Sequence, residues 1–126
     1  MKLDPIIAVE DVGLSAKWYE QIFGLKRTHG GEDFAVLVNE EGEVILCLHK
    51  WGEHQHPILS DKKVKAGNGL ILYFKTANLE LIRKKVKELN ATVQQEMHLN
   101  SNSLKKEFSF IDRDGYFLTV TEYHEY

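Results

Sequence analysis

The sequence of 126 residues has little cysteine, no excess of basic residues and no long apolar run, and each absence excludes a class of protein. A single cysteine, Cys47, excludes an intramolecular disulfide and a cysteine-rich zinc site. Sixteen Lys and Arg residues against nineteen Asp and Glu residues give a net charge of −3, which argues against a nucleic-acid-binding surface. No stretch approaches the roughly 20 apolar residues that span a bilayer, and no apolar signal segment is recognisable. We therefore expect a soluble cytoplasmic protein with no nucleic-acid or membrane partner.

The common catalytic motifs are also missing. The sequence contains no glycine-rich phosphate loop and no spacing typical of a Ser–His–Asp triad. Asp112 and Asp114 adjoin Gly115, which predicts a turn rather than a pair of catalytic carboxylates. Cys47 lies between two leucines of a predicted strand, which favours a buried structural thiol over a nucleophile.

Hydrophobic periodicity predicts one strand, one helix and three strands in the first half of the chain. The apolar run at 6–9 predicts a strand. Leu14, Trp18 and Ile22 recur on one face, which predicts a helix at 14–23 that ends at Gly24. Further strands are predicted at 25–30, 34–39 and 44–50, and a long loop at 51–68.

The second half repeats this order. A strand is predicted at 70–75, a helix opened by Asn78 at 79–90, and strands at 92–95, 107–111 and 116–123, with a polar loop at 97–105. Asp11 and Asn78, which open the two helices, are 67 positions apart, and the turn glycines Gly42 and Gly115 are 73 apart. The halves therefore superpose with about six extra residues in the second, most simply in the polar loop.

This repeat predicts an α+β fold of two βαβββ modules, at about 1–50 and 69–126, within a single domain 1–126. One face of each sheet would carry its helix. The other faces would form a curved mixed sheet that encloses a cavity. The alternative is a generic α+β sandwich in which the similarity of the halves is coincidental.

Two segments resemble a known superfamily. Ile7-Ala8-Val9-Glu10-Asp11-Val12, followed by Ser15, Trp18-Tyr19 and Phe23-Gly24-Leu25, resembles its opening module. Phe110-Ile111-Asp112-Arg113-Asp114-Gly115-Tyr116, continuing to Glu122, resembles its closing module, usually written F-x-D-P-D-G-N. The superfamily is that of glyoxalases, bleomycin resistance proteins and extradiol dioxygenases, also called vicinal oxygen chelate proteins. Arg113 replaces the usual proline, and Tyr116 replaces the usual asparagine.

The resemblance implies paired βαβββ modules, often in a homodimer. Enzymes of the group hold one divalent metal that acts as a Lewis acid, whereas other members bind a small molecule without chemistry. The metal positions map onto Asp4, Leu46, Ile71 and Thr119 of this chain. Only Asp4 among them suits a hard cation, and a shift of one residue does not restore the set. We therefore expect no metal and no other cofactor, with Asp4 the only metal candidate.

The histidines offer little to replace those ligands. His49, His54 and His56 lie within eight residues, and His-x-His is a spacing that metals accept, but an exposed polar loop past a strand end is the favoured interpretation. The remaining three, His29, His98 and His124, are isolated in sequence and predicted to lie on the surface.

Strand alternation predicts which side chains line the cavity. The metal-equivalent positions define the cavity face, so this face is predicted to be apolar with a few polar groups. The expected ligand-binding residues, to which Trp51 is added from the loop at the mouth, are Ile6, Leu46, Leu48, Trp51, Ile71, Tyr73, Phe117, Thr119 and Thr121. Phe108 and Phe110 share one face of their strand, and the sequence leaves open which. It also leaves open whether side chains fill the cavity.

These observations favour metal-independent binding of an apolar or aromatic small molecule by a homodimer. The first alternative is a divergent metal-dependent lyase, isomerase or dioxygenase that uses Asp4 and either His49 or Tyr73. The second is a regulatory or protein-interaction module on the same scaffold. A metal or small molecule that co-purifies with the protein would distinguish them.

Overall fold

The computed structural model of the chain describes residues 1–52, 63 and 67–125. It divides into two compact units, Met1–Lys65 (unit 1) and Ala66–Tyr126 (unit 2). Each unit contains one strand, one helix and three further strands, so the predicted α+β fold with two βαβββ modules is confirmed. None of the helices in the described residues is long and apolar enough to span a membrane.

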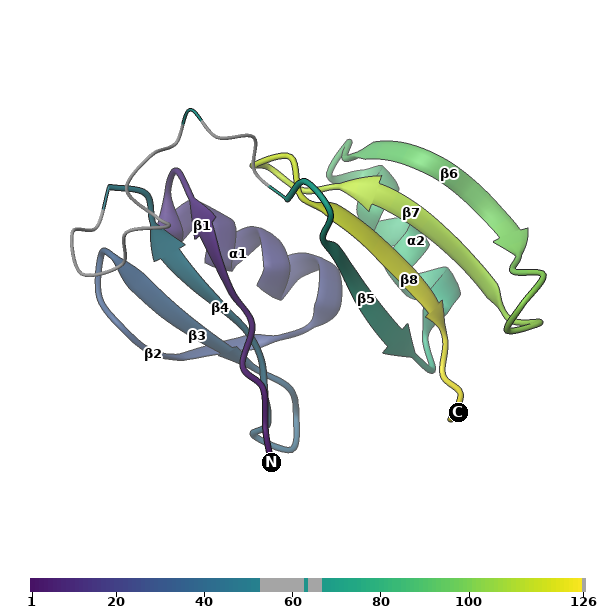
Figure 1. Cartoon of the computed structure of the whole chain (residues 1–126), viewed down its shortest axis with the longest axis horizontal. Helices are drawn as coiled ribbons and strands as arrows, with labels where there is room; N and C mark the ends of the chain where they lie inside the picture. Colours follow the sequence, from purple (N-terminus) through teal and green to yellow (C-terminus); the bar gives the residue numbers. More distant parts are fainter. Residues whose placement is uncertain (53–62, 64–66, 126) are drawn as a thin grey trace. The chain divides into compact units, whose positions relative to one another are not determined.

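Unit 1 is a four-stranded mixed sheet with one helix on one face (Figure 1). In chain order its elements are β1 (Ile6–Val9), α1 (Val12–Phe23), β2 (Lys26–His29), β3 (Phe34–Val38) and β4 (Val44–Lys50). The strand order is β1-β4-β3-β2, and only the β1–β4 pair is parallel. The parallel pair follows from the helix, because α1 carries the chain back across the sheet before the antiparallel meander begins.

The ends of α1 follow the sequence signals. The side chain of Asp11 accepts a hydrogen bond from the backbone N–H of Leu14 at 2.9 Å, which satisfies one donor of the first turn. Gly24 has a φ of 69° and its N–H donates to the carbonyl of Glu20, so the helix ends in a left-handed residue as predicted.

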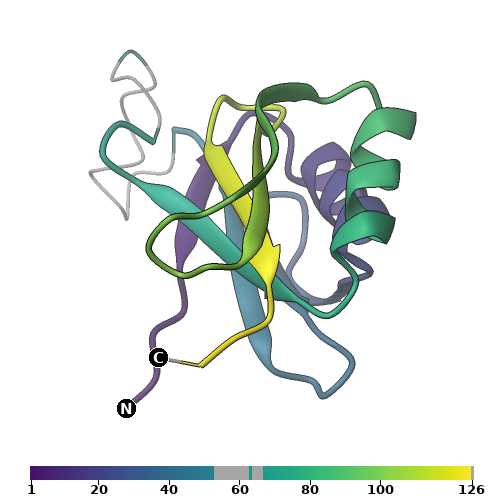
Figure 2. The same ribbon diagram turned by 90° about the vertical axis from the view of Figure 1, so that its right-hand side faces the viewer.

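Unit 2 repeats the architecture with the order β5-β8-β7-β6 (Figures 1 and 2). Its elements are β5 (Ile71–Thr76), α2 (Leu79–Glu88), β6 (Thr92–Leu99), β7 (Lys106–Ile111) and β8 (Phe117–Glu122). Figure 2 shows α2 against one face of this sheet. Asn78 occupies the predicted position before α2, but its side chain makes no capping hydrogen bond.

The core of unit 2 answers a question that the sequence left open. Phe108 and Phe110 are both fully buried and their rings stack with centroids 5.5 Å apart. They alternate with Glu107 and Ser109 along β7 and pair with Val120 and Leu118 of β8. Because the guanidinium of Arg83 on α2 lies 5.6 Å from the Phe108 ring, this is the face that packs against the helix.

One strand differs from the prediction. The sequence predicts a short strand at 92–95 and a loop from 97, whereas β6 continues to Leu99. β6 begins 66 residues after β2, whereas β7 begins 72 residues after β3. The six extra residues of the second unit therefore lie between the start of β6 and the start of β7, as the sequence predicts. Part of them lengthens the strand, because its polar side chains pair with β7 despite lacking an apolar pattern.

Candidate functional site

The register of β4 overturns part of the predicted cavity face. Leu46 pairs with Leu37, and Leu48 pairs with Ile7 and Ala35, and all of these side chains are buried in the core of unit 1. Leu46 and Leu48 therefore lie on the side of the sheet that α1 covers, and the prediction that they face away from the helix is wrong. A register shift between Leu37 and Val38 adds one residue to β4, which reverses the alternation counted from the turn at Gly42.

Cys47 and His49 take the face that the leucines were expected to occupy. Cys47 pairs with Ile6, and His49 with Ala8 and Phe34, and the His49 ring is edge-on to Phe34 with centroids 5.9 Å apart. His49 is buried, so the expectation of an exposed loop residue is wrong for it, while His54 and His56 lie outside the described residues. Burial, and then the negative charge of Asp4, raises the pKa of the Cys47 thiol.

The residues at the positions implied for a metal do not fit a divalent cation. Leu46 is in the core and Ile71 offers only carbon. The Thr119 hydroxyl is 2.9 Å from the hydroxyl of Ser109, with which it shares a hydrogen bond. Cys47, which replaces Leu46 on that face, has a thiol with a raised pKa, and thiols bind metals as thiolates. Across the described parts of the chain, no three His, Cys, Asp or Glu side chains gather at one point.

Unit 2 carries a denser group of polar side chains on the sheet face turned away from α2. We call this the polar face and define it by Tyr73, Glu107, Ser109, Thr119 and Thr121, which strand pairing places side by side. All except Tyr73 are buried. The prediction that Tyr73, Thr119 and Thr121 share the face turned away from the helix is therefore correct. This face is more polar than the sequence predicts.

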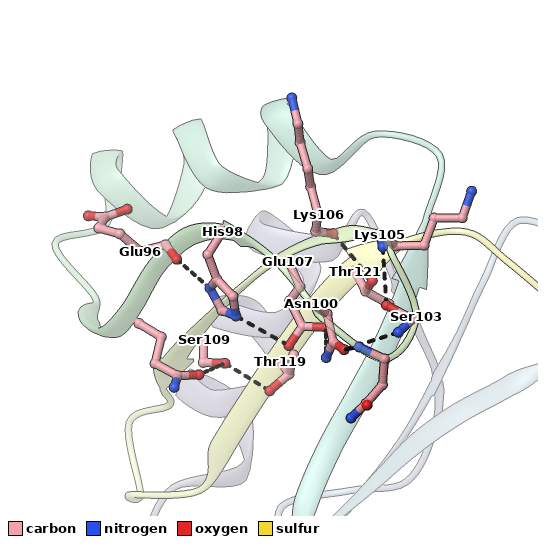
Figure 3. Close-up of polar contacts among 12 residues, drawn as sticks. Glu96, His98, Asn100, Ser103, Lys105, Lys106, Glu107, Ser109, Thr119 and Thr121 are labelled. Atoms are coloured by element: carbon pink, nitrogen blue, oxygen red, sulfur yellow. Dashed lines mark hydrogen bonds and ion pairs between the residues drawn. The ribbon is translucent and has the colours of Figure 1, made fainter.

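Glu107 is the central group of the polar face (Figure 3). Its Oε1 accepts hydrogen bonds from Asn100 Nδ2 at 2.9 Å and from the hydroxyl of Tyr73 at 3.4 Å. Its Oε2 lies 3.8 Å from Nε2 of His98, an ion-pair distance that is too long for a hydrogen bond. The side chain of Glu107 is only 8% exposed, so these contacts hold a carboxylate that has lost most of its water.

A groove of about 480 Å³ adjoins this cluster within unit 2. Its lining residues are Tyr73, Asn100, Asn102, Ser103, His124 and Glu125. Asn100 organises one wall, because its Oδ1 accepts from the backbone N–H groups of Asn102 and Ser103. Tyr73 and Asn100 thus face both the groove and the Glu107 carboxylate.

The other predicted site residues lie in varied surroundings. Ile6 and Ile71 are well exposed on the first strands of the two units. Phe117 is half-buried and pairs with Ile71, and the half-buried Trp51 donates its backbone N–H to the carbonyl of Val9. Thr121 is fully buried, and its hydroxyl donates to the carbonyl of Lys106 at 3.3 Å.

Three residues of the candidate site are not predicted from the sequence: Glu107, His98 and Asn100. The sequence does contain a signal for Glu107, because polar and aromatic side chains alternate over residues 107–110. If the phenylalanines face the core, then Glu107 and Ser109 point to the other side of the sheet. Nothing comparable marked His98 and Asn100, since their placement depends on the unexpected length of β6.

A family model now connects this architecture with known proteins. The model of the Glyoxalase/Bleomycin resistance protein/Dioxygenase superfamily matches residues 2–120. The chain belongs to this superfamily. The match covers nearly the whole chain and confirms the resemblance seen in the opening and closing segments.

Solved structures agree with membership of the glyoxalase superfamily at the level of the fold. A protein of unknown function from Agrobacterium tumefaciens str. C58 is 22% identical with a TM-score of 0.79, over 98% of this chain and 95% of its own. A glyoxalase/bleomycin resistance protein/dioxygenase family enzyme from Burkholderia phytofirmans PsJN is 15% identical with a TM-score of 0.76, over 93% and 94%. Lactoylglutathione lyase from Agrobacterium tumefaciens is 16% identical with a TM-score of 0.71, over 97% and 92%. A search of curated proteins found no match.

Proposed function

We propose that this glyoxalase-superfamily protein binds an organic small molecule without a divalent metal, at the polar face of unit 2 and the groove beside it. The observation that carries the proposal is the juxtaposition of an exposed aromatic ring with buried polar groups. Tyr73 is 40% exposed, and its hydroxyl donates to the carboxylate of the buried Glu107 at 3.4 Å. Small-molecule sites commonly combine apolar surface with a few fixed polar groups in this way.

Two further features support binding over the metal-dependent chemistry of the superfamily. The residues at the implied metal positions include a core leucine and an exposed isoleucine, which supply no ligand atoms. The carboxylate of Glu125 lines the groove and that of Glu107 contacts its Tyr73 wall, and negative charges of this kind do not stabilise a developing oxyanion. The proposed activity is therefore recognition and retention of a ligand.

The proposal extends the predicted ligand class in one respect. The sequence favours an apolar or aromatic ligand, and the exposed Ile71 and Tyr73 side chains on β5 provide the matching surface. The hydroxyl and carboxylate groups beside them favour a ligand that also carries a polar group, because a few fixed polar groups in a site orient a ligand by hydrogen bonds.

A nuclear magnetic resonance titration with the neutral aromatic probe 2-phenylethanol tests the site. We expect the probe to shift the backbone signals of Tyr73 and Asn100, and Tyr73→Ala to weaken its binding by about 1–3 kcal/mol because the ring contact is lost. Leu81→Ala is the matched control, since Leu81 is exposed on α2. Binding that is unchanged in Tyr73→Ala would contradict the assignment.

The same titration examines the role of metal. Dialysis against a chelator should leave probe binding unchanged, and Asp4→Ala should change it by less than a factor of a few. Loss of binding on chelation, restored by one divalent cation, would favour the metal-dependent alternative.

A further inference from the structure

The Glu107 carboxylate has one oxygen available to a ligand. Oε1 is occupied by Asn100 and Tyr73, whereas no donor among the described residues lies within hydrogen-bonding distance of Oε2. A carboxylate oxygen accepts about two hydrogen bonds, and a side chain that is 8% exposed has little water to supply them. Oε2 is not among the fully buried side-chain atoms of the described residues that lack a partner, so a donor carried by a ligand can reach it.

His98 presents a second acceptor to the same point. Its Nδ1 lies 2.8 Å from the backbone carbonyl of Glu96, and because a carbonyl only accepts, Nδ1 carries the hydrogen. In the neutral ring Nε2 then holds a lone pair, and this nitrogen lies 3.8 Å from Oε2 of Glu107. Figure 3 shows the His98 ring directed at the carboxylate. Two acceptors that face each other are stabilised by a positively charged donor placed beside both.

Tyr73 is a third side chain here that suits a cation. Its ring is exposed while its hydroxyl donates to Oε1, so a group bound near Oε2 lies close to the ring. Aromatic faces attract ammonium groups, more strongly where water is excluded. The groove next to the ring also carries the carboxylate of Glu125. Lys75 lies on the same face of β5 as Tyr73, where it pairs with Thr121, and its ammonium donates to the carbonyl of the groove residue His124 at 3.0 Å.

We propose that the polar face binds the protonated amine of an organic ligand, with Glu107 as its counter-ion, His98 Nε2 as a second acceptor and the Tyr73 ring beside it. The inference rests on the proposed function and specifies its ligand as an aromatic or aliphatic primary amine. A primary ammonium has three donors and one positive charge, which match the acceptors and the charge of this cluster.

Three probes of equal size test the charge preference on the unaltered protein. They are 2-phenylethylamine, the neutral 2-phenylethanol and the anionic phenylacetate, titrated at about pH 8, where histidine side chains are ordinarily neutral. We expect the amine to bind about tenfold or more tightly than the alcohol, because it makes a charge-assisted hydrogen bond, and phenylacetate to bind most weakly. A chelator in every sample keeps trace metals away from His98 and Glu107.

Glu107→Gln assigns the preference to one residue. Glutamine keeps a carbonyl oxygen for Asn100 and Tyr73 but removes the charge, so the advantage of the amine over the alcohol should fall to about twofold or less. Glu88→Gln is the matched control, because it removes one negative charge from the exposed surface of α2 and should leave the advantage intact.

The outcomes separate this inference from the proposed function. Equal binding of the amine and the alcohol, or tighter binding of phenylacetate, overturns the amine assignment and leaves the binding site in place. Failure of all three probes to bind overturns both proposals. The ranking in the unaltered protein decides the inference even where Glu107→Gln fails to fold.

Discussion

At the scale of single residues, the turn before β8 shows how one side chain fixes a backbone path. Oδ1 of Asp112 accepts from the backbone N–H groups of Asp114 at 2.9 Å and Tyr116 at 2.8 Å, and Gly115 between them has a φ of 94°. The sequence predicts this turn because aspartate and glycine have opposite roles in it: one accepts hydrogen bonds, and the other adopts the left-handed backbone.

We expect Asp112→Ala to lower the free energy of unfolding by about 1–3 kcal/mol, because both N–H groups lose their acceptor and that of Tyr116 is buried. Urea denaturation of the purified protein measures the loss. Arg113→Ala, an exposed neighbour in the same turn, should change stability by less than about 0.5 kcal/mol. Equal effects of the two substitutions would show that the Asp112 side chain is unimportant.

Cys47 is predicted to react slowly. Burial and the charge of Asp4 raise the pKa of its thiol, so the reactive thiolate is rare and poorly accessible. Alkylation by iodoacetamide should be at least about tenfold slower in the folded protein than in urea. Asp4→Asn should speed alkylation of the folded protein at fixed pH, since removal of the negative charge lowers the pKa. A rate unaffected by Asp4→Asn would contradict the electrostatic contribution.

The same raised pKa determines a pH dependence of stability. The folded chain holds the thiol proton more tightly than the unfolded chain, so this contribution is fully present below the thiol pKa of the unfolded chain. It declines as the pH rises through the raised pKa of the folded protein. In Cys47→Ala, the free energy of unfolding measured by urea denaturation should fall less as the pH is raised into the alkaline range, because this thiol no longer contributes.

At the scale of elements, the sequence predicts the order and type of every strand and helix but not all of their lengths and faces. The ends of α1 are well predicted because Asp11 and Gly24 mark them. The apolar face of α1 is not well predicted, because Leu14 of the expected stripe is exposed whereas Tyr19 is buried. The facing of β4 is not well predicted either, because the extra residue opposite Leu37 and Val38 leaves no mark in the composition of the strand. Long-range pairing also determines where β6 ends.

The turn between β6 and β7 contains a strained residue. Leu104 has a φ of 60°, a left-handed conformation that costs an L-residue roughly 1–2 kcal/mol, and its side chain is exposed. Leu104→Gly should therefore raise the free energy of unfolding by about 0.5–1 kcal/mol, after the greater flexibility of unfolded glycine is subtracted. Thermal unfolding measures the gain.

Leu99→Gly provides the matched control, because Leu99 is equally a surface leucine but belongs to β6. It should lower stability by about 1 kcal/mol, since glycine is unfavourable in a strand. Destabilisation by Leu104→Gly would show that contacts of the Leu104 side chain outweigh the backbone strain.

At the scale of the whole molecule, the residues of the core and those of the candidate site differ in how well the sequence predicts their positions. Alternation predicts that Phe108 and Phe110 share one face of β7, but only the structure shows that this face is the buried one. The candidate site was only partly predictable: Tyr73 and Thr119 follow from alternation, whereas Asn100 reaches Glu107 only after β6 has run its full length. A site assembled from several strands depends on every register among them.

The assembly of the chain is a further prediction at this scale. The superfamily resemblance led us to expect a homodimer, and the exposed Ile6 and Ile71 side chains are apolar surface that such an interface would cover. Light scattering at micromolar concentration should give twice the chain mass of 14.5 kDa, with an interface of more than about 1,000 Å² in total. A mass of one chain at that concentration would contradict it.

The unequal lengths of β2 and β6 carry a consequence for protein engineering. β2 has four residues and ends at His29, whereas β6 has eight and ends at Leu99, so His98 and Asn100 have no counterpart in unit 1. The two copies of the repeat are alike in the scaffold and unlike in the groups that a ligand would meet. A designer who wished to install the same acceptors in unit 1 would have to lengthen a hairpin, because substitutions within the existing strand supply no position for them.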